Sequence, residues 1–430
     1  MDIQTLYNIY LEHKNITTDS RNIKKDSLFF ALKGENFDGN AFALDALDKG
    51  ASYSIIDNPN YATNNRCILV DNVLETLQAL ALHHRKQLSI PFIGITGTNG
   101  KTTTKELVKA VLSKKYRTYA TEGNFNNHLG VPLTLLSIPS NAEIAIIEMG
   151  ANHIGEIDFL CKIALPDFGI ITNIGKAHLE GFGSFEGVIQ TKTELYNFIK
   201  SRNGVLFVNA DNELLMQNAQ GINHKTYGTT ENSNIKGAYR SSNPYMNFYF
   251  ENTDVVYSVN TKLLGKYNFD NAMAAVCIGA YFNVDLFDIK EAIENYEPSN
   301  SRSQMKQTPL NKLILDCYNA NPSSMKAAID NFGTLNISGK KVIMLGGMKE
   351  LGSDSEKEHR NVVELVRNYN FDLSVFVGKE FAFVTNNETT LWFDNVTDAK
   401  SHFEQNPISN ATILLKGSNS VRMGLLENSL

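Results

Sequence analysis

The sequence predicts an α/β protein of several domains, with a doubly wound parallel sheet at its centre, from three observations. The 430 residues are too many for one ordinary hydrophobic core, so two or three domains are expected. Along the middle of the chain, short apolar runs typical of buried strands alternate with helical stretches. After a turn-rich segment the same alternation begins again, which predicts a second α/β domain at the C-terminal end.

The segment up to residue 88 mixes short strands with helical stretches. A helix is predicted at 73–85, because the leucines of this stretch fall largely on one helical face. Residues 87–91 are the expected junction to the next domain. The strands expected in this first segment are 27–32, 53–57 and 67–70.

The middle segment carries the pattern of the doubly wound sheet. Its Asn- and Tyr-rich stretch at 223–260 favours antiparallel strands or a meander at the edge of that sheet, and an apolar helix is expected at 271–280. The strands expected before this stretch are 92–96, 144–148, 168–173 and 204–209.

A second junction is predicted at 298–302, which is rich in turn-forming residues. New strand candidates follow it and alternate with helices, as in a second α/β domain. These candidates are 313–316, 341–345, 373–377 and 412–416.

The composition is that of a soluble, enzyme-like globular protein, with 42% hydrophobic and 20% charged residues. The net charge of −6 argues against a general nucleic-acid partner or an anionic membrane surface. The N-terminal residues do not resemble a signal peptide, and no apolar run approaches the about 20 residues of a membrane span. The cysteines are far apart and are expected to be reduced thiols in a cytoplasmic protein. They are Cys67, Cys161, Cys277 and Cys317.

The most specific motif is a Gly-rich turn between an apolar run and a helix-compatible stretch, at 91–106. In such a loop backbone N–H groups face an anion, Lys101 reaches the terminal phosphates, and the Thr102 hydroxyl can hold Mg²⁺. The strict pattern would place a glycine where Ile95 stands, so the loop is a variant. A bare Gly-Lys-Thr can also be a plain helix start. The strand before it and the helix after it favour nucleotide binding.

Glu148 ends an apolar run that is expected to lie beside the strand of the phosphate loop. An acid at the carboxyl end of such a strand can reach the Mg²⁺ of a nucleotide. Alternatively, it is an acid that only terminates a strand and lies in solvent. The phosphate loop favours the metal role.

The Gly-rich loop 172–183 follows the next strand and carries His178 and Glu180 at the same sheet edge. A histidine in a loop is often only structural, but this edge favours a metal or phosphate role for His178. Residues 190–194 are expected to open a helix. Lys192 in this stretch has no obvious partner, so from its own surroundings it could be an ordinary exposed lysine.

A dense set of amide side chains at 121–132 is expected between two helices. The cluster could be turn chemistry, or it could recognise a polar substrate, because asparagine supplies donors and acceptors without charge.

The order of these motifs resembles the Mur ligases over residues 18–422, and most closely the members that act on UDP-MurNAc-tripeptide and D-Ala-D-Ala. The motifs are Ile-Thr-Gly-Thr-Asn-Gly-Lys-Thr-Thr-Thr-Lys-Glu at 95–106, Gly-Asn-Phe-Asn-Asn-His-Leu-Gly-Val-Pro-Leu-Thr-Leu-Leu at 123–136, Glu-Met-Gly-Ala-Asn at 148–152, Ala-His-Leu-Glu-Gly-Phe-Gly-Ser at 177–184 and Tyr-Asn-Ala-Asn-Pro at 318–322.

The resemblance implies a UDP-substrate domain at 1–88, a central ATPase domain at 89–300 and a Rossmann-like domain at 301–430. It also implies that ATP phosphorylates the carboxylate of UDP-MurNAc-tripeptide and that the amine of D-Ala-D-Ala attacks the acyl phosphate. The third residue of the tripeptide, lysine or diaminopimelate, stays open. A monomer in cytoplasmic peptidoglycan synthesis is expected.

The resemblance also carries roles to individual positions. Lys101, His178 and Lys192 are expected to be catalytic, and Lys192 matches a carbamylated lysine, whose added CO₂ makes it a carboxylate-like metal ligand. The expected metal ligands are Thr102 and Glu148 on one Mg²⁺, His178 on a second metal, and Lys192. The expected ATP contacts are Gly97, Thr98, Asn99, Gly100, Lys101, Thr102, Thr103, Asn268, Asn271, Arg302 and Asp316. The expected substrate contacts are Ser20, Arg21, Lys33, Asn124, Asn126, Asn127, Asn319 and Asn321.

The chain departs from the family pattern at a few positions. Tyr267 stands where the family commonly has histidine. Gly347 and Cys317 stand where acids are frequent, and Asn419 where arginine is frequent. These last three lie in the third domain, so they bear on how the amine substrate is held and not on the ATP chemistry.

Two other functions fit part of the pattern. One is another amide ligase of the same superfamily, such as a folylpolyglutamate synthetase, but the Asn-rich block and the first domain argue against it. A P-loop switch or transport ATPase would need neither the loop of His178 nor Lys192.

Overall fold

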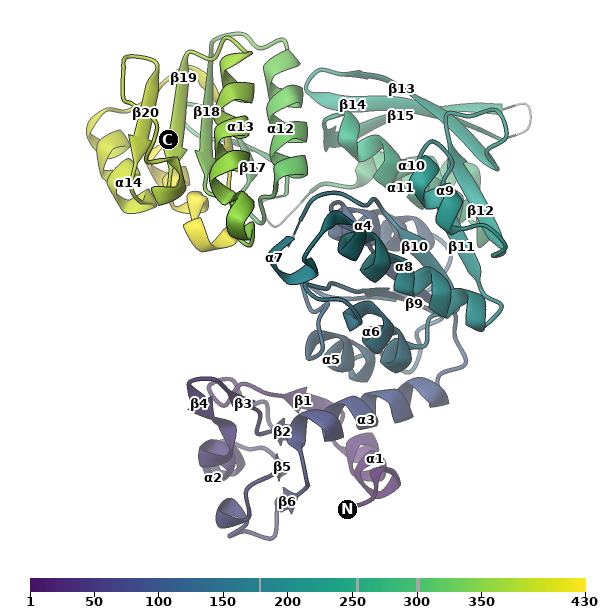
Figure 1. The fold of residues 1–430 in the computed structure, drawn as a ribbon. Coiled ribbons are helices and arrows are strands. Elements are labelled where there is room, and N and C mark those ends of the chain that lie inside the picture. The colour runs from purple at the N-terminus through teal and green to yellow at the C-terminus, as the bar shows by residue number, and fades with distance from the viewer. Residues whose placement is uncertain (178, 253–254, 299–301) are drawn as a thin grey trace.

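The computed structural model describes residues 1–177, 179–252, 255–298 and 302–430. Sheets of four, nine and six strands form an N-terminal, a central and a C-terminal unit, and a two-stranded hairpin belongs to the first. In Figure 1 the N-terminal unit lies at one end of the molecule, and the C-terminal unit lies beside the central unit. The predicted α/β class is confirmed.

The N-terminal unit is a small parallel sheet of order β1-β2-β5-β6 with helices beside it. The predicted strands and the predicted helix of this segment are present, with ends that differ by a few residues. The strands are β1 Asn15–Thr17, β2 Ser27–Phe30, β5 Tyr53–Ile56 and β6 Cys67–Leu69, with the hairpin β3 Lys33–Gly34 and β4 Phe37–Asp38. The helices are α1 Ile3–Glu12, α2 Ala43–Asp48 and α3 Val73–Gln87.

The central sheet has the order β15-β14-β13-β12-β11-β10-β7-β9-β8. Its strands are β7 Phe92–Thr96, β8 Thr118–Ala120, β9 Ile144–Glu148, β10 Phe168–Ile171, β11 Val205–Asn209, β12 His224–Gly228, β13 Ile235–Ser242, β14 Tyr245–Asn252 and β15 Val255–Leu264. Strand β7 lies between β9 and β10 and is parallel to both. The loops after these three strands therefore leave the sheet at one edge, as predicted.

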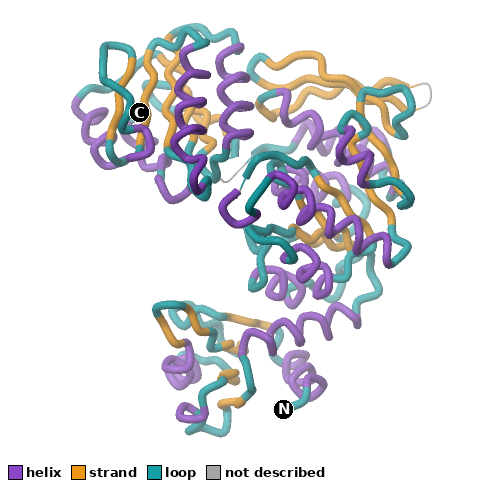
Figure 2. Tube along the Cα trace, viewed as in Figure 1, coloured by secondary structure: helices purple, strands orange, loops and turns teal. Residues whose placement is uncertain are grey.

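Helices cover both faces of the central sheet, as Figure 2 shows. On β9, alternate residues Ala145 and Ile147 pack in one apolar cluster with Leu160 of α6, whereas Ile144 and Ile146 pack in a second cluster with α4, α10 and α11. The central helices are α4 Lys101–Leu112, α5 Gly130–Leu136, α6 Glu156–Ala164, α7 Leu179–Phe182, α8 Phe185–Ser201, α9 Glu213–Asn218, α10 Phe269–Tyr281 and α11 Leu286–Asn295.

Two local predictions for the central unit needed correction. The antiparallel edge at 223–260 is confirmed for β13, β14 and β15, but β12 is parallel to both of its neighbours. Strand β10 ends at Ile171 and not at Asn173, because Thr172 and Asn173 turn to hydrogen-bond Asn99 of the phosphate loop.

The C-terminal unit is a six-stranded sheet of order β16-β17-β21-β18-β19-β20, parallel except for β16. Helices α12 and α13 pack on one face, and α14 packs on the other with the C-terminal residues. The strands are β16 Gln304–Gln307, β17 Lys312–Asp316, β18 Lys340–Gly346, β19 Leu373–Val377, β20 Thr390–Phe393 and β21 Ala411–Lys416. The helices are α12 Pro322–Thr334, α13 Ser355–Arg367 and α14 Val396–Gln405.

The N-terminal and central units share one apolar cluster, in which Leu77 and Leu80 of α3 join Val131 of α5. Arg85 strengthens this junction, since its guanidinium donates to the carbonyls of Ala164 and Leu165 at 2.8 Å each. The two units are therefore packed together by a buried surface and not only linked by the chain.

The predicted domain boundaries after residues 88 and 300 stay predictions. The second falls within 299–301, which, like His178 and residues 253–254, lies outside the described residues. All four cysteines are free, as expected, and three of them are buried. Across the described ranges, no helix combines the length and apolar character that crossing a bilayer requires.

Candidate active site

A cavity of about 840 Å³ opens at the carboxyl edge of the central sheet and reaches the C-terminal unit. Most of the residues that the sequence marked as site residues line it, although they come from positions far apart in the chain. These are residues 97–103, Asn124, Asn126, Asn127, Glu148, Lys192, Asn268, Asn271, Arg302, Asp316 and Asn319. The structure brings them together, while their individual roles stay predictions.

The phosphate loop, residues 97–102, needs its two glycines. Gly97 has φ of 142° and Gly100 has φ of 79°, in the region that favours glycine. A Cβ at Gly97 would lie 2.0 Å from Oγ1 of Thr172, and one at Gly100 would lie 2.5 Å from Oδ1 of Asn271. Both backbone angle and space therefore demand glycine, and helix α4 begins directly after the turn.

The loop is braced by the segment that follows β10. The backbone N–H of Thr98 donates to the carbonyl of Asn173 at 2.9 Å, and that of Asn99 donates to Oδ1 of Asn173 at 3.0 Å. The hydroxyl of Thr98 accepts from the backbone of Gly175 at 2.9 Å. The shape of the loop is thus set by its neighbour in the sheet before any ligand binds.

Lys101 folds back over this loop. Its ammonium donates to the carbonyls of Gly97 at 2.7 Å and Thr98 at 3.1 Å. Burial lowers the pKa of Lys101, Arg302 lowers it further, and Glu148 opposes both effects. A polyanion in the cavity would stabilise the charged form of this lysine.

Thr102 and Glu148 form a buried pair at the floor of the cavity. The hydroxyl of Thr102 lies 3.0 and 3.2 Å from the two oxygens of Glu148, whose residue is only 1% exposed. The side chain of Asn126 donates to Oε1 of Glu148 at 2.8 Å, and the ammonium of Lys105 lies 3.6 Å from Oε2. Glu148 is therefore a buried carboxylate oriented from three sides, and not a solvent-exposed strand end.

These oxygen atoms fit a small hard cation. Hydroxyl and carboxylate oxygens are what Mg²⁺ prefers, and it usually takes one or two from protein and the rest from phosphates and water. Within the described ranges no three His, Cys, Asp or Glu residues gather in a group that could hold a metal ion alone. The pair of Thr102 and Glu148 accordingly matches a metal that is shared with a phosphate ligand.

The Asn-rich block has more than one use, and its surroundings differ from the prediction. It follows the short strand β8 and precedes α5, so the expected preceding helix was wrong. Asn127 stabilises a turn, because its Oδ1 accepts hydrogen bonds from the backbone N–H groups of Leu129 and Gly130. Asn126 orients Glu148, and Asn124 lines the cavity together with Tyr318 of the C-terminal unit.

Lys192 on α8 is only 2% exposed, so it is not an ordinary surface lysine. Its ammonium lies 5.3 Å from the ring centroid of Phe182, and it forms no hydrogen bond or ion pair with any described residue. Burial lowers the pKa of Lys192 to about 7, with a smaller contribution from Lys101. A substantial fraction is thus the neutral amine near pH 7. His178, the other predicted member of this group, lies outside the described residues.

Asn268 and Asn271 connect α10 to the helix of the phosphate loop. Oδ1 of Asn271 accepts from the hydroxyl of Thr104 at 3.1 Å, and its amide donates to Oδ1 of Asn268 at 2.9 Å. Tyr267 extends this link, since its hydroxyl lies 2.8 Å from that of Ser303 beside the predicted second junction. The tyrosine at the family's histidine position therefore joins the central unit to the chain that enters the C-terminal unit.

The C-terminal unit contributes a loop, residues 316–321, between β17 and α12. The guanidinium of Arg302 lies 3.6 Å from the ring centroid of Tyr318. The carboxylate of Asp316 accepts from the ammonium of Lys416 at 2.6 Å. Lys416 lines the cavity but was missed by the sequence reasoning. The sequence did contain a signal for Lys416, because it is a charged residue at the carboxyl end of an apolar strand, as Glu148 is.

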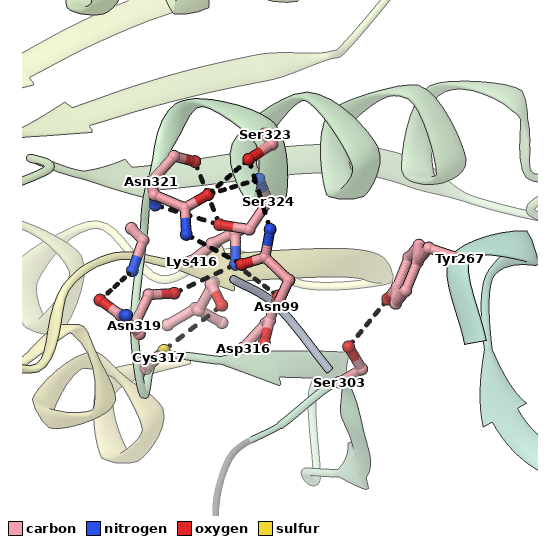
Figure 3. Close-up of polar contacts among 12 residues, drawn as sticks. Asn99, Tyr267, Ser303, Asp316, Cys317, Asn319, Asn321, Ser323, Ser324 and Lys416 are labelled. Atoms are coloured by element: carbon pink, nitrogen blue, oxygen red, sulfur yellow. Dashed lines mark hydrogen bonds and ion pairs between the residues drawn. The ribbon is translucent and has the colours of Figure 1, made fainter. Parts of the chain in front are cut away.

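Asn321 caps helix α12 and also reaches the phosphate loop, as Figure 3 shows. Its Oδ1 accepts from the backbone of Ser324 at 2.8 Å, while its amide donates to Oδ1 of Asn99 at 2.8 Å. The amide of Asn99 donates in turn to the hydroxyl of Ser323 at 3.3 Å. Unlike Asn319, Asn321 is not among the residues that line the cavity.

The predicted substrate contacts of the N-terminal unit do not line the described cavity. The guanidinium of Arg21 donates to the carboxylate of Asp19 on an otherwise exposed turn. Lys33 pairs with Asp57 at 2.8 Å, and the carbonyl of Ser20 accepts from Lys49 at 3.0 Å. These residues therefore lie on the first unit, outside the cavity.

Three positions of the C-terminal unit differ from the family pattern, and each has different surroundings. A Cβ at Gly347 would lie 2.6 Å from Oε2 of Glu380, so any side chain there would have to displace that carboxylate. Cys317 is buried and its thiol donates to the carbonyl of Leu415 at 3.3 Å. Asn419 is exposed in a short 3₁₀ helix.

Three family models match successive parts of the chain. They are described as the Mur ligase family catalytic domain at residues 12–85, the Mur ligase middle domain at 95–279, and the Mur ligase glutamate ligase domain at 301–419. The matched ranges follow the three sheets in order.

Curated relatives and solved structures match almost the whole length. UDP-N-acetylmuramoyl-tripeptide–D-alanyl-D-alanine ligase of Bacillus subtilis is 39% identical over 401 residues, which cover 92% of this chain and 84% of the relative. Its Escherichia coli counterpart is 34% identical over 422 residues, covering 95% and 91%.

Among solved structures, MurF from Acinetobacter baumannii superposes with a TM-score of 0.88 at 30% identity, covering 100% of this chain and 98% of the other. MurF ligase from Thermotoga maritima in complex with ADP has a TM-score of 0.85 at 27% identity, covering 97% of each chain. The resemblance predicted from the motifs is confirmed. The chain belongs to the Mur ligase family, in its branch of UDP-N-acetylmuramoyl-tripeptide–D-alanyl-D-alanine ligases.

Proposed function

We propose that this chain is an ATP-dependent amide-forming ligase that joins D-alanyl-D-alanine to UDP-N-acetylmuramoyl-tripeptide in cytoplasmic peptidoglycan precursor synthesis. Relatives that carry this name cover nearly all of the chain. The observation that carries the proposal is the common cavity of Lys101, Glu148 and Lys192, which the C-terminal unit also lines. A simple P-loop ATPase needs no such shared cavity.

The phosphate loop is the proposed cradle of ATP. Residues 97–103 line the cavity, and the solved Thermotoga maritima relative was crystallised with ADP. Asn268, Asn271, Arg302 and Asp316 lie around the same cavity and are the proposed contacts of the rest of the nucleotide. Lys101 would exchange its two loop carbonyls for phosphate oxygens.

Thr102 and Glu148 are the proposed protein ligands of Mg²⁺. Their buried oxygens, 3.0 Å apart at the closest, are hard donors that fit this ion. When bound, Mg²⁺ offsets negative charge on the transferred phosphate. Asn126 and Lys105 would keep the carboxylate of Glu148 oriented.

Lys192 is the proposed site of carbamylation. Its buried amine has a pKa of about 7 and forms no ion pair with any residue that the structure describes. The neutral amine, which is the nucleophile, is therefore available near neutral pH. The amine nitrogen attacks the carbon of CO₂, so that one N–C bond forms while one C–O π bond opens and leaves its electron pair on oxygen, and the nitrogen releases a proton to solvent. The product is an anion on α8, which with His178 would supply ligands to a second metal.

The proposed reaction has two steps. A carboxylate oxygen of the tripeptide attacks the γ-phosphorus of ATP, the bond to ADP breaks, and an acyl phosphate forms. The amine of D-alanyl-D-alanine then attacks the acyl carbon, loses a proton, and expels phosphate. Lys101 and Arg302 offset the negative charge that gathers on the phosphate oxygens.

The three units would divide the binding of substrates. Ser20, Arg21 and Lys33 on the N-terminal unit are the proposed contacts of the UDP moiety, outside the catalytic cavity. Asn124 and Asn319 line the cavity where the peptide and the dipeptide would meet. We infer domain boundaries after residues 88 and 300, and a monomer whose units close around bound substrates.

Phosphate release measured with ATP, Mg²⁺ and UDP-N-acetylmuramoyl-tripeptide, with and without D-alanyl-D-alanine, tests the proposal. Release should need the dipeptide and should match the amount of amide product found by mass spectrometry. Release that ignores both substrates would instead identify a P-loop ATPase. Glutamate addition to a folate without any use of the dipeptide would identify a folylpolyglutamate-type ligase.

A further inference from the structure

Lys416 is a buried lysine at the carboxyl end of β21, in the wall of the catalytic cavity. Only 2% of the residue is exposed. In the parallel sheet, Lys416 is the register partner of Asp316 at the end of β17. Neighbouring strands therefore present the cation and the carboxylate at the same edge, which is the edge where this sheet faces the phosphate loop.

The ammonium of Lys416 holds both ends of one short stretch of chain. It donates to Oδ2 of Asp316 at 2.6 Å and to the backbone carbonyl of Asn319 at 3.3 Å, as Figure 3 shows. Tyr318 lies between these two anchor points and stacks on Arg302. One side chain thus ties together positions 316 and 319 of the loop 316–321.

This loop supplies several of the residues with which the C-terminal unit lines the cavity. Asp316, Tyr318 and Asn319 line the cavity themselves. Asn321, at the end of the same loop, hydrogen-bonds Asn99 of the phosphate loop. A shift of the loop would move all of these groups together, because they are only a few residues apart.

The ion pair of Lys416 with Asp316 also favours a structural role for Lys416 over direct binding of an anionic substrate. Among the described residues, Lys416 is the sole ion-pair partner of Asp316. Lys416 is buried and Asp316 is largely so, with 3% of the Lys416 side chain and 18% of the Asp316 side chain exposed. A lysine already neutralised at 2.6 Å has little attraction left for a distant anion.

We propose that Lys416 is a positioning residue that fixes the loop 316–321 for the nucleotide and for the amine substrate. The inference rests on the proposed function. It assigns to Lys416 an action through Asp316 and Asn319, without contact to the reacting atoms.

The test uses the full-length protein and the variants Lys416→Met, Asp316→Asn and the double variant. ADP affinity is measured by calorimetry, and the KM values are measured for ATP, UDP-N-acetylmuramoyl-tripeptide and D-alanyl-D-alanine. Lys416→Met should weaken ADP binding and raise the KM of the dipeptide by about tenfold each, the effect of one lost charged hydrogen bond. The KM of the UDP substrate should stay within about twofold, because its proposed contacts lie on another unit.

The double variant separates positioning from direct binding. If Lys416 acts through Asp316, the double variant should bind ADP no more weakly than the weaker single variant. The proposal would be overturned if the double variant lost ADP affinity by the product of the two single losses. It would also be overturned if Lys416→Met left the affinities unchanged. Lys416→Met could fail to fold because it leaves Asp316 unpaired. In that case the double variant, which is neutral at both positions, is compared with Asp316→Asn alone. Equal ADP affinities then support the proposal, and a further tenfold loss contradicts it.

Lys341→Met is the matched control. Lys341 also belongs to this sheet, on β18, and its ammonium donates to the carbonyl of Gly333 at 2.8 Å, but it does not line the cavity. Its kinetics should equal those of the wild type. Because ADP binding needs no ligation, a wild-type protein that binds ADP but forms no amide would contradict the proposed function and still allow this test of Lys416.

Discussion

The amide of Asn321, at the start of helix α12, donates a hydrogen bond of 2.8 Å to Oδ1 of Asn99 in the phosphate loop. The amide of Asn99 donates back across the same junction to the hydroxyl of Ser323. Figure 3 shows this pair of contacts next to Lys416 and Asp316. The C-terminal unit therefore touches the loop that is proposed to hold ATP, so nucleotide binding and the placement of this unit are physically linked.

Asn321→Ser should weaken this link without unfolding the helix. Serine is as good an N-cap as asparagine, but it is too short to reach Asn99. We expect the KM for ATP to rise by about threefold to tenfold, the value of one hydrogen bond, with little change in the melting temperature. Steady-state kinetics and thermal unfolding check this. Asn395→Ser is the control, because Asn395 caps α14 elsewhere in the same unit. If both variants behave alike, the contact with Asn99 has no role in ATP binding.

Glu148→Gln should change the dependence on Mg²⁺. Glutamine keeps an acceptor oxygen for Thr102 but removes the charge that a cation needs. We expect kcat to fall by about a hundredfold or more, with a higher Mg²⁺ concentration for half-maximal activity. Phosphate release is measured over a Mg²⁺ titration. Glu143→Gln, which removes a surface acid paired with Arg117, serves as the control. An unaltered Mg²⁺ titration in Glu148→Gln would rule out the metal role.

Lys105→Met should destabilise the protein through Glu148. Both side chains are nearly fully buried, and the ammonium also donates to the carbonyl of Gly123 at 3.2 Å. Removing one partner of a buried pair typically costs about 3–5 kcal/mol. Denaturant unfolding should therefore show a lower midpoint, and Lys105→Met combined with Glu148→Gln should recover part of the loss. An additive loss in the double variant would mean that Lys105 acts independently of Glu148.

Lys192→Ala should abolish ligation, and added bicarbonate should not restore it, because alanine has no amine to react with CO₂. Lys192→Arg should also be inactive, since its guanidinium stays charged and forms no carbamate. Rates are measured by amide formation, and a mass increase equal to CO₂ is sought in the native protein. Lys200→Ala, near the end of the same helix, is the control. Full activity of Lys192→Arg would exclude the carbamate.

Acid should weaken the packing of α1 against α3 in the N-terminal unit through His84. This histidine on α3 is buried, its Nδ1 lies 3.1 Å from the hydroxyl of Tyr7, and burial lowers its pKa to about 4. The folded state therefore favours the neutral imidazole. Its contribution to stability is complete above the ordinary histidine pKa of 6.5 and is lost as the pH falls from there toward 4.

Thermal unfolding at pH 7.5 and pH 5 checks this prediction. The wild type should lose more thermal stability between these two conditions than His84→Asn, which cannot be protonated in this range. His402→Gln, on α14 of the C-terminal unit, should keep the pH dependence of the wild type. An equal drop for wild type and His84→Asn would contradict the role of His84.

The features that the sequence predicted well are local in the chain. The glycines at 97 and 100 stand next to Lys101 and Thr102, so the phosphate loop could be recognised from one short stretch. Strands such as Phe92–Thr96 and Ile144–Glu148 were predicted to the residue, because runs buried on both faces are apolar throughout. Their parallel order also followed, since it placed Glu148 beside the loop as expected.

The sequence could not determine which polar residues meet across the chain. Asp316 and Lys416 are 100 residues apart, and Asn99 and Asn321 are 222 apart, so no local pattern connects them. The same holds for Lys192, whose burial and lowered pKa depend on helices packed around α8. The sequence by itself thus determined the phosphate loop, the strands and the family. The tertiary structure decided which charges are paired, because pairing depends on distances in space and on the exclusion of water.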